Sequence, residues 1–401
     1  MELSEIDFVV IALVAVAAPL IARALVRWVR VPIVVFELCL GIVIGPSLLG
    51  WVQPGLISER LADFGLALLF FVAGNEIDFA VVRGRSGRRA ATGWIVSLAA
   101  GIAAGLLIAP GEAAVVVGIA LSSTALGALL PILRDARMLP TPFGRAVMAV
   151  GAAGEFGPLV AISLFLGGRD IGLASIVLAL FVAVAGLAVF AAVRVPNGRL
   201  HEIVTSTLHT SGQFAVRVII LILAALVALS LVLDLDMLLG AFVAGVVWQL
   251  IMRNAPEPDR AQVESKVEGL AFGVFVPMFF VYTGVTFDLQ ALVEDPRDAL
   301  LVPVFLVLLL VVRGLPALLS IPAGASGRER GAMVFLGATG LPIIVAVTAI
   351  GVDAGILREG LGAALVGAGM LSVLLFPLVG MSLRGVRERD LAREPADDDA
   401  V

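Results

Sequence analysis

The residue with the clearest potential for chemistry is Glu155, a carboxylate in the middle of a long apolar segment. It lies in the sequence GAAGEFGP at 151–158, near the centre of the predicted helix 143–167. Holding an ionisable side chain at membrane depth costs about 2.5–3.5 kcal/mol on insertion scales, so such residues usually serve a function. Pro158 also removes the helical hydrogen bond of the Gly154 carbonyl. We expect Glu155 to bind a proton or an ion, the alternative being a carboxylate paired only for helix packing.

One basic residue, Arg313, lies well inside another apolar segment, in VVRGLP at 311–316. Opposite charges inside a helix bundle offset each other's desolvation, so Arg313 is the natural charge-compensating partner of Glu155. The alternative is an arginine whose long side chain reaches the cytoplasmic interface.

Two further apolar segments are interrupted by polar or helix-disfavouring residues. The first contains Ser122, Ser123 and Thr124, and the second contains Thr339 in the sequence ATGLP at 338–342. Broken helices at corresponding positions of a transporter expose backbone carbonyls and helix ends to an ion. Each segment taken alone could equally be a kink without a ligand.

Three other acidic residues, Glu37, Glu76 and Asp78, lie nearer the predicted cytoplasmic ends of their helices. They could line an entry funnel, or they could simply be solvated. The two histidines, His201 and His209, have no acidic or cysteine partners at ligand spacing, and Cys39 is the single cysteine, so we expect no metal site beyond a transported cation. The sequence contains no phosphate-binding Gly-Lys-Ser/Thr loop, so we expect no ATP-driven pump, no cofactor and no enzyme.

The elements that position these residues are membrane helices. The 401-residue chain is 60% hydrophobic and 15% charged, with a mean hydropathy of +1.10, whereas soluble domains carry about 25% charged residues. The sequence predicts an all-α polytopic protein with about thirteen transmembrane helices, and the first of them lacks a cleavage pattern behind it. The helices are expected at 8–29, 33–50, 63–82, 90–109, 113–133, 143–167, 171–193, 214–233, 237–252, 268–286, 298–320, 331–350 and 358–382.

Basic residues alternate between the loops and predict the topology. One set of loops is rich in arginine, and the other holds only Arg60, Arg169, Arg297 and Arg358. Because short cytoplasmic loops retain positive charge, the N-terminus is expected outside and the C-terminus in the cytoplasm of a cell (inner) membrane. The transmembrane domain is expected at 1–383, followed by a disordered cytoplasmic tail at 384–401.

A weak internal echo indicates an inverted-topology repeat. The sequence FFVAGNEIDF at 70–79 resembles FFVYTGVTFD at 279–288, seven predicted helices later. An odd displacement places equivalent segments in opposite orientation. We expect one repeat at 8–167, a linker helix at 171–193 and a second repeat at 214–382, the alternative being chance similarity between apolar stretches.

The chain resembles a known family over residues 8–383. The stretches that carry the likeness are VPIVVFEL (31–38), GIVIGPSLLG (41–50), FGLALLFFVAG (64–74), ALSSTA (120–125) and LGAFVAG (239–245). They resemble the monovalent cation:proton antiporter family, which includes bacterial sodium/proton exchangers and the membrane domains of glutathione-gated potassium efflux systems. The resemblance implies a homodimer in which two discontinuous helices cross, Ser122–Thr124 against Thr339–Pro342, beside the ion-binding carboxylate. Family members usually have Asp-Asp, Asn-Asp or Gln-Asp where this chain has Gly154-Glu155, and many carry lysine where it has Arg313.

The expected activity is exchange of sodium or potassium for protons by alternating access, with one ion at a time on Glu155. The expected partners are these ions and the lipid bilayer, with no nucleic acid. The rival readings are a proton-uncoupled cation channel, an organic-anion symporter in which Arg313 holds the substrate, and a membrane sensor or intramembrane enzyme. The last lacks a visible nucleophile–base pair or metal cluster inside the spans. The sequence leaves the choice between sodium and potassium open.

Overall fold

The computed structural model of the chain describes residues 3–25, 32–77, 84–167, 170–194, 213–253 and 255–384. Within these ranges the secondary structure is entirely helical, and nine helices are long and apolar enough to cross a membrane. Shorter apolar helices occupy Ile33–Ile44, Ile171–Leu187 and Met237–Met252. The chain is therefore a multi-pass membrane protein, as its composition predicts.

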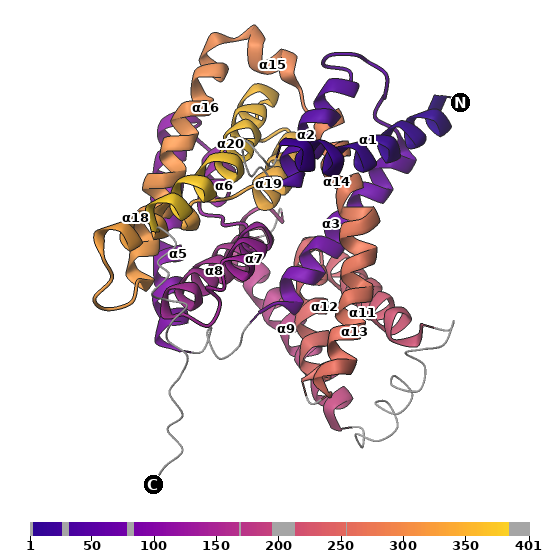
Figure 1. Ribbon diagram of the computed structural model, residues 1–401, viewed down its shortest axis with the longest axis vertical. Coiled ribbons are helices and arrows are strands. Elements are labelled where there is room, and N and C mark those ends of the chain that lie inside the picture. The colour runs from indigo at the N-terminus through magenta and orange to yellow at the C-terminus, as the bar shows by residue number, and fades with distance from the viewer. Residues whose placement is uncertain are drawn as a thin grey trace.

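The helices form two bundles with a gap between them in the view of Figure 1. The first bundle consists of α1 (Leu3–Leu25), α2 (Ile33–Ile44), α3 (Leu56–Asn75), α11 (Phe214–Val232), α12 (Met237–Met252), α13 (Glu257–Leu270), the π-helix η1 (Ala271–Phe275) and α14 (Val276–Val285). The helix α9 (Ile171–Arg194) contacts both bundles, through α8 on one side and α12 on the other.

The second bundle, which we call the crossover bundle, contains both interrupted helices. It consists of α5 (Arg85–Ile108), α6 (Ala113–Leu121), α7 (Leu126–Asp135), α8 (Pro142–Phe165), α15 (Leu289–Glu294), α16 (Pro296–Leu308), the π-helix η2 (Leu309–Gly314), α17 (Leu315–Ala317), η3 (Leu318–Ser320), α18 (Gly327–Gly337), α19 (Pro342–Asp353) and α20 (Glu359–Arg384).

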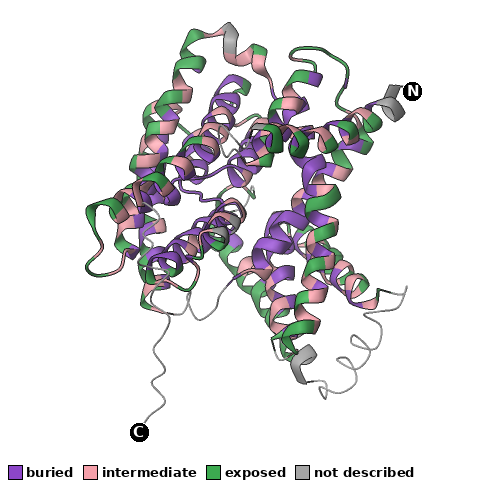
Figure 2. Ribbon diagram, in the orientation of Figure 1, coloured by how far each residue is buried: buried purple, intermediate pink, exposed green. Residues whose placement is uncertain are grey.

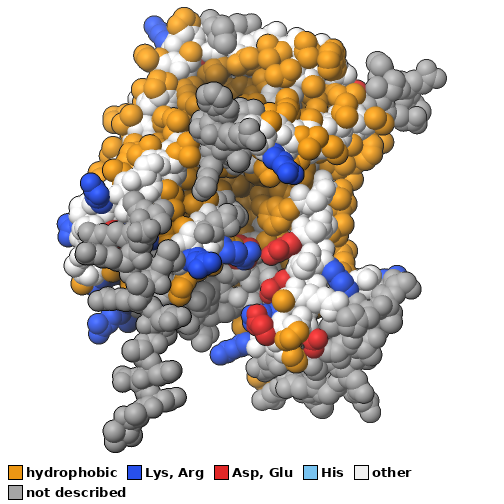
Figure 3. Space-filling model, viewed as in Figure 1, with side chains coloured by type: hydrophobic (Ala, Val, Ile, Leu, Met, Phe, Trp, Pro, Cys, Tyr) orange, Lys and Arg blue, Asp and Glu red, His pale blue; other side chains and the backbone are white. Residues whose placement is uncertain are grey.

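Burial separates the central helices from those on the outside. In the span Ala113–Leu130, 83% of the residues are buried, against 22% in the equally apolar α5. Figure 2 shows the same contrast between the interior of the crossover bundle and the outer faces of α5 and α16. A helix that is apolar all round but buried on one side only must meet lipid on the other. Figure 3 accordingly shows a largely hydrophobic outer surface, with most charged side chains at the lower end and in a hollow between the bundles.

The largest differences from the predicted bounds are in three helices. The third helix is Leu56–Asn75 rather than 63–82. Its first turns carry the exposed residues Glu59 and Arg60, and hydropathy does not identify such charged turns as part of a membrane helix. The tenth helix begins at Glu257 rather than 268, because helical turns with charged residues precede its apolar part. The apolar part ends at Val285. The second ends at Ile44, where Gly45 leaves the helical conformation.

Two helix pairs of the first bundle are related by a displacement of seven helices, which is the displacement that the internal sequence similarity suggests. Gly41 and Gly284 bring α2 and α14 into backbone contact, and Gly74 and Gly245 do the same for α3 and α12. The contact between predicted helices two and ten thus corresponds to the contact between predicted helices nine and three, because helix nine lies seven helices after helix two and helix ten lies seven after helix three. The inverted repeat remains a prediction, which this recurrence favours.

Candidate functional site

The break between α6 and α7 lies at the centre of the crossover bundle. Ser122, Ser123 and Thr124 are each no more than 1% exposed. The hydroxyls of Ser122 and Ser123 donate to the carbonyls of Ile119 and Ala120 in the last turn of α6, at 2.9 and 2.8 Å. Each hydroxyl oxygen retains lone pairs that can accept a hydrogen bond or contact a cation.

The break between α18 and α19 crosses the first break directly. The Ala125 N–H donates to the Thr339 carbonyl at 2.7 Å, and the Thr339 hydroxyl donates to Phe335 O within its own helix. The expected crossing of the two discontinuous helices is therefore present, and Thr339 contributes its backbone oxygen to it.

Thr124 is the point where four segments meet. Its N–H donates to Gly154 O at 2.9 Å, which is the carbonyl that Pro158 leaves without a helical partner. Its hydroxyl donates to Gly337 O at 2.6 Å and accepts from Arg313 Nε at 2.7 Å. A single residue thus connects the two breaks, α8 and η2.

Glu155 lies beside this crossing and is 3% exposed. The N–H of Leu126, the first residue of α7, donates to its carboxylate. A helix N-terminus carries partial positive charge and favours a carboxylate there. The second carboxylate oxygen, Oε2, is buried and has no hydrogen-bond partner among the described residues. Buried oxygens are normally satisfied, so Oε2 is an open ligand position.

Arg313 is 1% exposed and forms no direct ion pair with Glu155 among the described residues, so its charge-compensating role stays a prediction. Its guanidinium donates instead to Thr124 Oγ1 and, through Nη2, to Val150 O at 2.6 Å. These two acceptors satisfy donors of the buried guanidinium inside the crossover bundle. Its alternative, a side chain extended to the interface, is wrong, because Arg313 is buried.

The three residues expected to line a funnel lie in different environments or outside the described residues. Glu76 follows α3 directly and lies close enough to Glu155 for electrostatic repulsion, with Arg134, Glu264 and Glu268 as its other charged neighbours. Figure 3 shows acidic side chains at the inner edge of the hollow between the bundles. Glu37 is 4% exposed on α2 and so is not a solvated interface residue. Asp78 lies outside the described residues, as do His201, His209 and the tail after Arg384.

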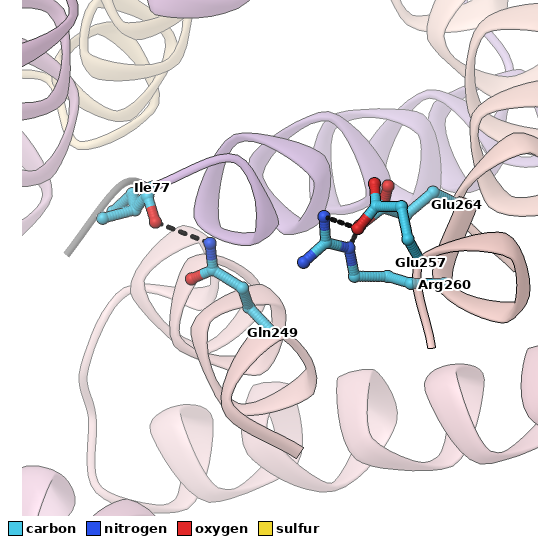
Figure 4. A network of polar contacts seen from close by, with 5 residues as sticks. All are labelled: Ile77, Gln249, Glu257, Arg260 and Glu264. Atoms are coloured by element: carbon cyan, nitrogen blue, oxygen red, sulfur yellow. Dashed lines mark hydrogen bonds and ion pairs between the residues drawn. The ribbon is translucent and has the colours of Figure 1, made fainter. Parts of the chain in front are cut away.

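A polar network lies in the first bundle, on α12, on α13 and just after α3 (Figure 4). Gln249 of α12 donates to Ile77 O at 2.6 Å, and Arg260 pairs with Glu257 at 2.6 Å and Glu264 at 3.6 Å. Glu264 also lines a small pocket together with Phe71, Val72, Asn75, Trp248, Val267 and Glu268. These groups join α3, α12 and α13 at the end of the molecule where Glu76 lies.

Sequence reasoning missed Ser372, which holds the second break. The Gly340 N–H donates to Ser372 Oγ at 3.1 Å, and the hydroxyl donates back to Gly340 O at 2.9 Å. Ser372 is the fourteenth residue of α20, as Glu155 is of α8. The predicted repeat pairs these two helices, but aligning their predicted starts, 143 and 358, pairs Glu155 with Met370, so the structure was needed to identify Ser372.

Comparisons with known proteins agree with this architecture. The family model "Sodium/hydrogen exchanger, transmembrane" matches residues 12–381. The chain is 26% identical to the putative Na(+)/H(+) antiporter YjbQ of Bacillus subtilis over 73% of this chain and 49% of that protein. It is 31% identical to the Na(+)/H(+)-K(+) antiporter GerN of Bacillus cereus over 70% of this chain and 72% of that protein. The match therefore spans about half the length of YjbQ and most of GerN.

Among solved structures, the sodium proton antiporter MjNhaP1 of Methanocaldococcus jannaschii at pH 8 superposes with a TM-score of 0.66. The match covers 96% of this chain and all of that chain at 15% identity, and this likeness concerns the fold. The model match along nearly the whole chain, together with the crossing of two broken helices, leads to one conclusion. The chain belongs to the transmembrane sodium/hydrogen exchanger family.

Proposed function

We propose that this chain exchanges a monovalent cation, Na⁺ or K⁺, for protons across the cell membrane. The observation that carries the proposal is Glu155, a buried carboxylate with one open oxygen beside the crossing of two broken helices. Its relatives include proteins named as Na(+)/H(+) and Na(+)/H(+)-K(+) antiporters. Family membership and geometry thus support the same class of activity.

The mechanism follows from competition for one carboxylate. A proton on Glu155 removes the charge that would hold a cation, and a bound cation excludes the proton, so each crossing carries one ion or the other. The cation would be held by Glu155 Oε2 with help from the hydroxyl and carbonyl oxygens of Ser122, Ser123, Thr124 and Thr339. Alkali cations favour such oxygen ligands because these replace the water lost on entry.

Charge balance at the site is shared between side chains and helix ends. The N-terminus of α7, with its partial positive charge, lies beside the Glu155 carboxylate. Arg313 adds a permanent positive charge on the other side of Thr124, where it compensates the carbonyl ends of the broken helices and, over a longer distance, Glu155. Glu76, whose charged neighbours include Glu155, is proposed to line a cytoplasmic funnel, for which Glu37 and Asp78 are further candidates.

The arrangement in the membrane follows the loop charges. The arginine-rich loops support an N-terminus outside and a C-terminus in the cytoplasm, so the end of α3 next to Glu76 is proposed to face the cytoplasm. The chain is proposed to work as a homodimer through the first bundle while the crossover bundle moves.

Reconstituted protein tests the proposal. In proteoliposomes with an imposed pH gradient, addition of Na⁺ or K⁺ should dissipate the gradient for the wild-type chain and not for Glu155→Gln, which is nearly isosteric but cannot titrate. A cation channel would instead carry cation flux that leaves the pH gradient intact in the absence of a membrane potential. The proposal fails if folded wild-type protein gives no proton flux with Na⁺, K⁺ or Li⁺.

A further inference from the structure

Position 154 has no room for a side chain. A Cβ built on Gly154 would lie 2.5 Å from Arg313 Nη2, 2.5 Å from Thr124 Oγ1 and 2.6 Å from Thr124 Cβ. Nonbonded Cβ contacts in proteins are essentially never this short. The guanidinium and the threonine therefore occupy the volume that any larger residue at 154 would need.

The atoms that fill this space are held there by specific bonds. Nη2 donates to Val150 O, one turn before Gly154 in α8, and Nε donates to Thr124 Oγ1. Thr124 N–H in turn donates to Gly154 O. The guanidinium thus lies against α8, bonded to the Val150 carbonyl on the turn that precedes Glu155.

We infer that Gly154 and Arg313 form a coupled pair, in which the missing side chain of Gly154 is the socket for the Arg313 guanidinium. Arg313 is then a positioning residue: it fastens η2 and the first helix break to α8 and so determines where Thr124 lies relative to Glu155. The inference concerns the same site as the proposed exchange and rests on that function only for its transport readout. The melting temperatures test the inference independently of the proposed function.

Replacing Arg313 by lysine keeps the positive charge but makes the side chain that fills the space at Gly154 smaller. A lysine ammonium would lie about where the guanidinium carbon lies, so it keeps the positive charge but lacks the distal Nη2 atom that approaches position 154. Arg313→Lys should therefore relieve the part of the clash of a new Cβ at 154 that comes from residue 313, whereas the close approach of that Cβ to Thr124 remains.

A double-mutant cycle of Gly154→Ala with Arg313→Lys tests the pair. We expect Gly154→Ala alone to lower the melting temperature and to reduce kcat/KM for the cation by roughly tenfold or more, mainly through KM. In the Arg313→Lys background the same alanine should cost clearly less in both quantities. If Gly154→Ala alone yields no folded protein, recovery of folded protein in the double variant is the expected result.

Gly157→Ala is the matched control, because a Cβ there would strike the Trp94 ring of α5 rather than Arg313. Its effect should be the same in the wild-type and Arg313→Lys backgrounds. Additive effects of Gly154→Ala and Arg313→Lys, or two variants that are equally unfolded, would overturn the pairing. Should the wild type show no exchange at all, the proposed function fails, and the melting temperatures still decide the inference.

Discussion

At the scale of single residues, Thr124 connects the parts of the site. Its backbone and hydroxyl together satisfy Gly154 O, Gly337 O and Arg313 Nε, which belong to three different helical segments. A buried donor or acceptor that loses its partner costs about 1–3 kcal/mol, and more if it is charged. The hydroxyl of Thr124 should therefore matter more for stability than those of its neighbours Ser122 and Ser123, which bond within α6.

Thr124→Val tests that difference. Valine keeps the shape but leaves Arg313 Nε and Gly337 O without partners, so we expect about 1–3 kcal/mol of destabilisation, measured as a lower melting temperature. Thr124→Ser should retain most of the stability. Thr348→Val is the control, since that buried hydroxyl bonds only within α19. Equal effects of the two valine substitutions would contradict the role of Thr124.

Ser372 makes a parallel prediction for the second break. Removing its hydroxyl in Ser372→Ala leaves both the N–H and the carbonyl of Gly340 without their side-chain partner. We expect a drop in melting temperature together with slower exchange, because Thr339 O loses support beside Ala125 N. Ser382→Ala on the same helix removes an exposed hydroxyl that bonds to Leu378 O and should change little. Normal stability and rate in Ser372→Ala would argue against its role.

At the scale of elements, helix ends supply the polarity that an apolar bundle lacks. The N-terminus of α7 meets Glu155, while the carbonyl ends of α6 and α18 meet Thr124 and its partners. Because both helices stop at the midpoint of the bundle, their backbone groups can face an ion without exposing unsatisfied groups to lipid.

One helix start outside the membrane should respond to pH. Asp236 caps α12 by accepting from Leu238 N–H at 2.8 Å, and burial raises its pKa to about 6. The folded state therefore holds this proton between about pH 4 and 6, where the unfolded chain has released it. Stability should fall as pH rises through that window and then level off.

Asp236→Asn measures this effect, because asparagine caps a helix as well as aspartate but carries no charge. The variant should melt at a higher temperature than the wild type near pH 7.5, and the difference should shrink towards pH 4.5. A difference that stays the same at both values would mean that Asp236 does not titrate in the folded protein.

Particular residues show how much the sequence could predict. The broken helices and the position of Glu155 followed from local signals, namely polar residues, glycine and proline inside apolar runs. The fate of Arg313 did not, because a lone buried charge indicates that a partner is needed but not which one. Its carbonyl partner Val150 O has no signature in the side-chain sequence. The starts of α3 and α13 were also missed, since hydropathy reports the membrane boundary and not the end of a helix.

At the scale of the whole molecule, alternating access requires one bundle to move against the other. Phe156, next to Glu155, stacks on Phe242 of α12 with ring centroids 5.4 Å apart, which places an aromatic contact across the boundary between the bundles. Phe64 and Phe275, with centroids 4.8 Å apart, both lie within the first bundle. The two pairs therefore report on movement between bundles and within one bundle.

Chemical cross-linking at these pairs tests the movement. The single native cysteine, Cys39, can be replaced by alanine to give a background without cysteines. We expect a short thiol cross-linker to stop exchange in the Phe156→Cys/Phe242→Cys variant and a reductant to restore it. The cross-linked Phe64→Cys/Phe275→Cys variant should keep its rate. Unchanged exchange with the first pair fully cross-linked would rule out relative motion of the bundles.

The central claim is that a cation and a proton compete for Glu155, and proton release on cation binding tests it most directly. Purified wild-type protein in weakly buffered detergent solution should release close to one proton for each Na⁺ or K⁺ bound, at a pH where the site is partly protonated. Glu155→Gln should release none, and Ser382→Ala should behave as the wild type. Saturable cation binding by folded wild-type protein without proton release, or undiminished release from Glu155→Gln, would contradict the account.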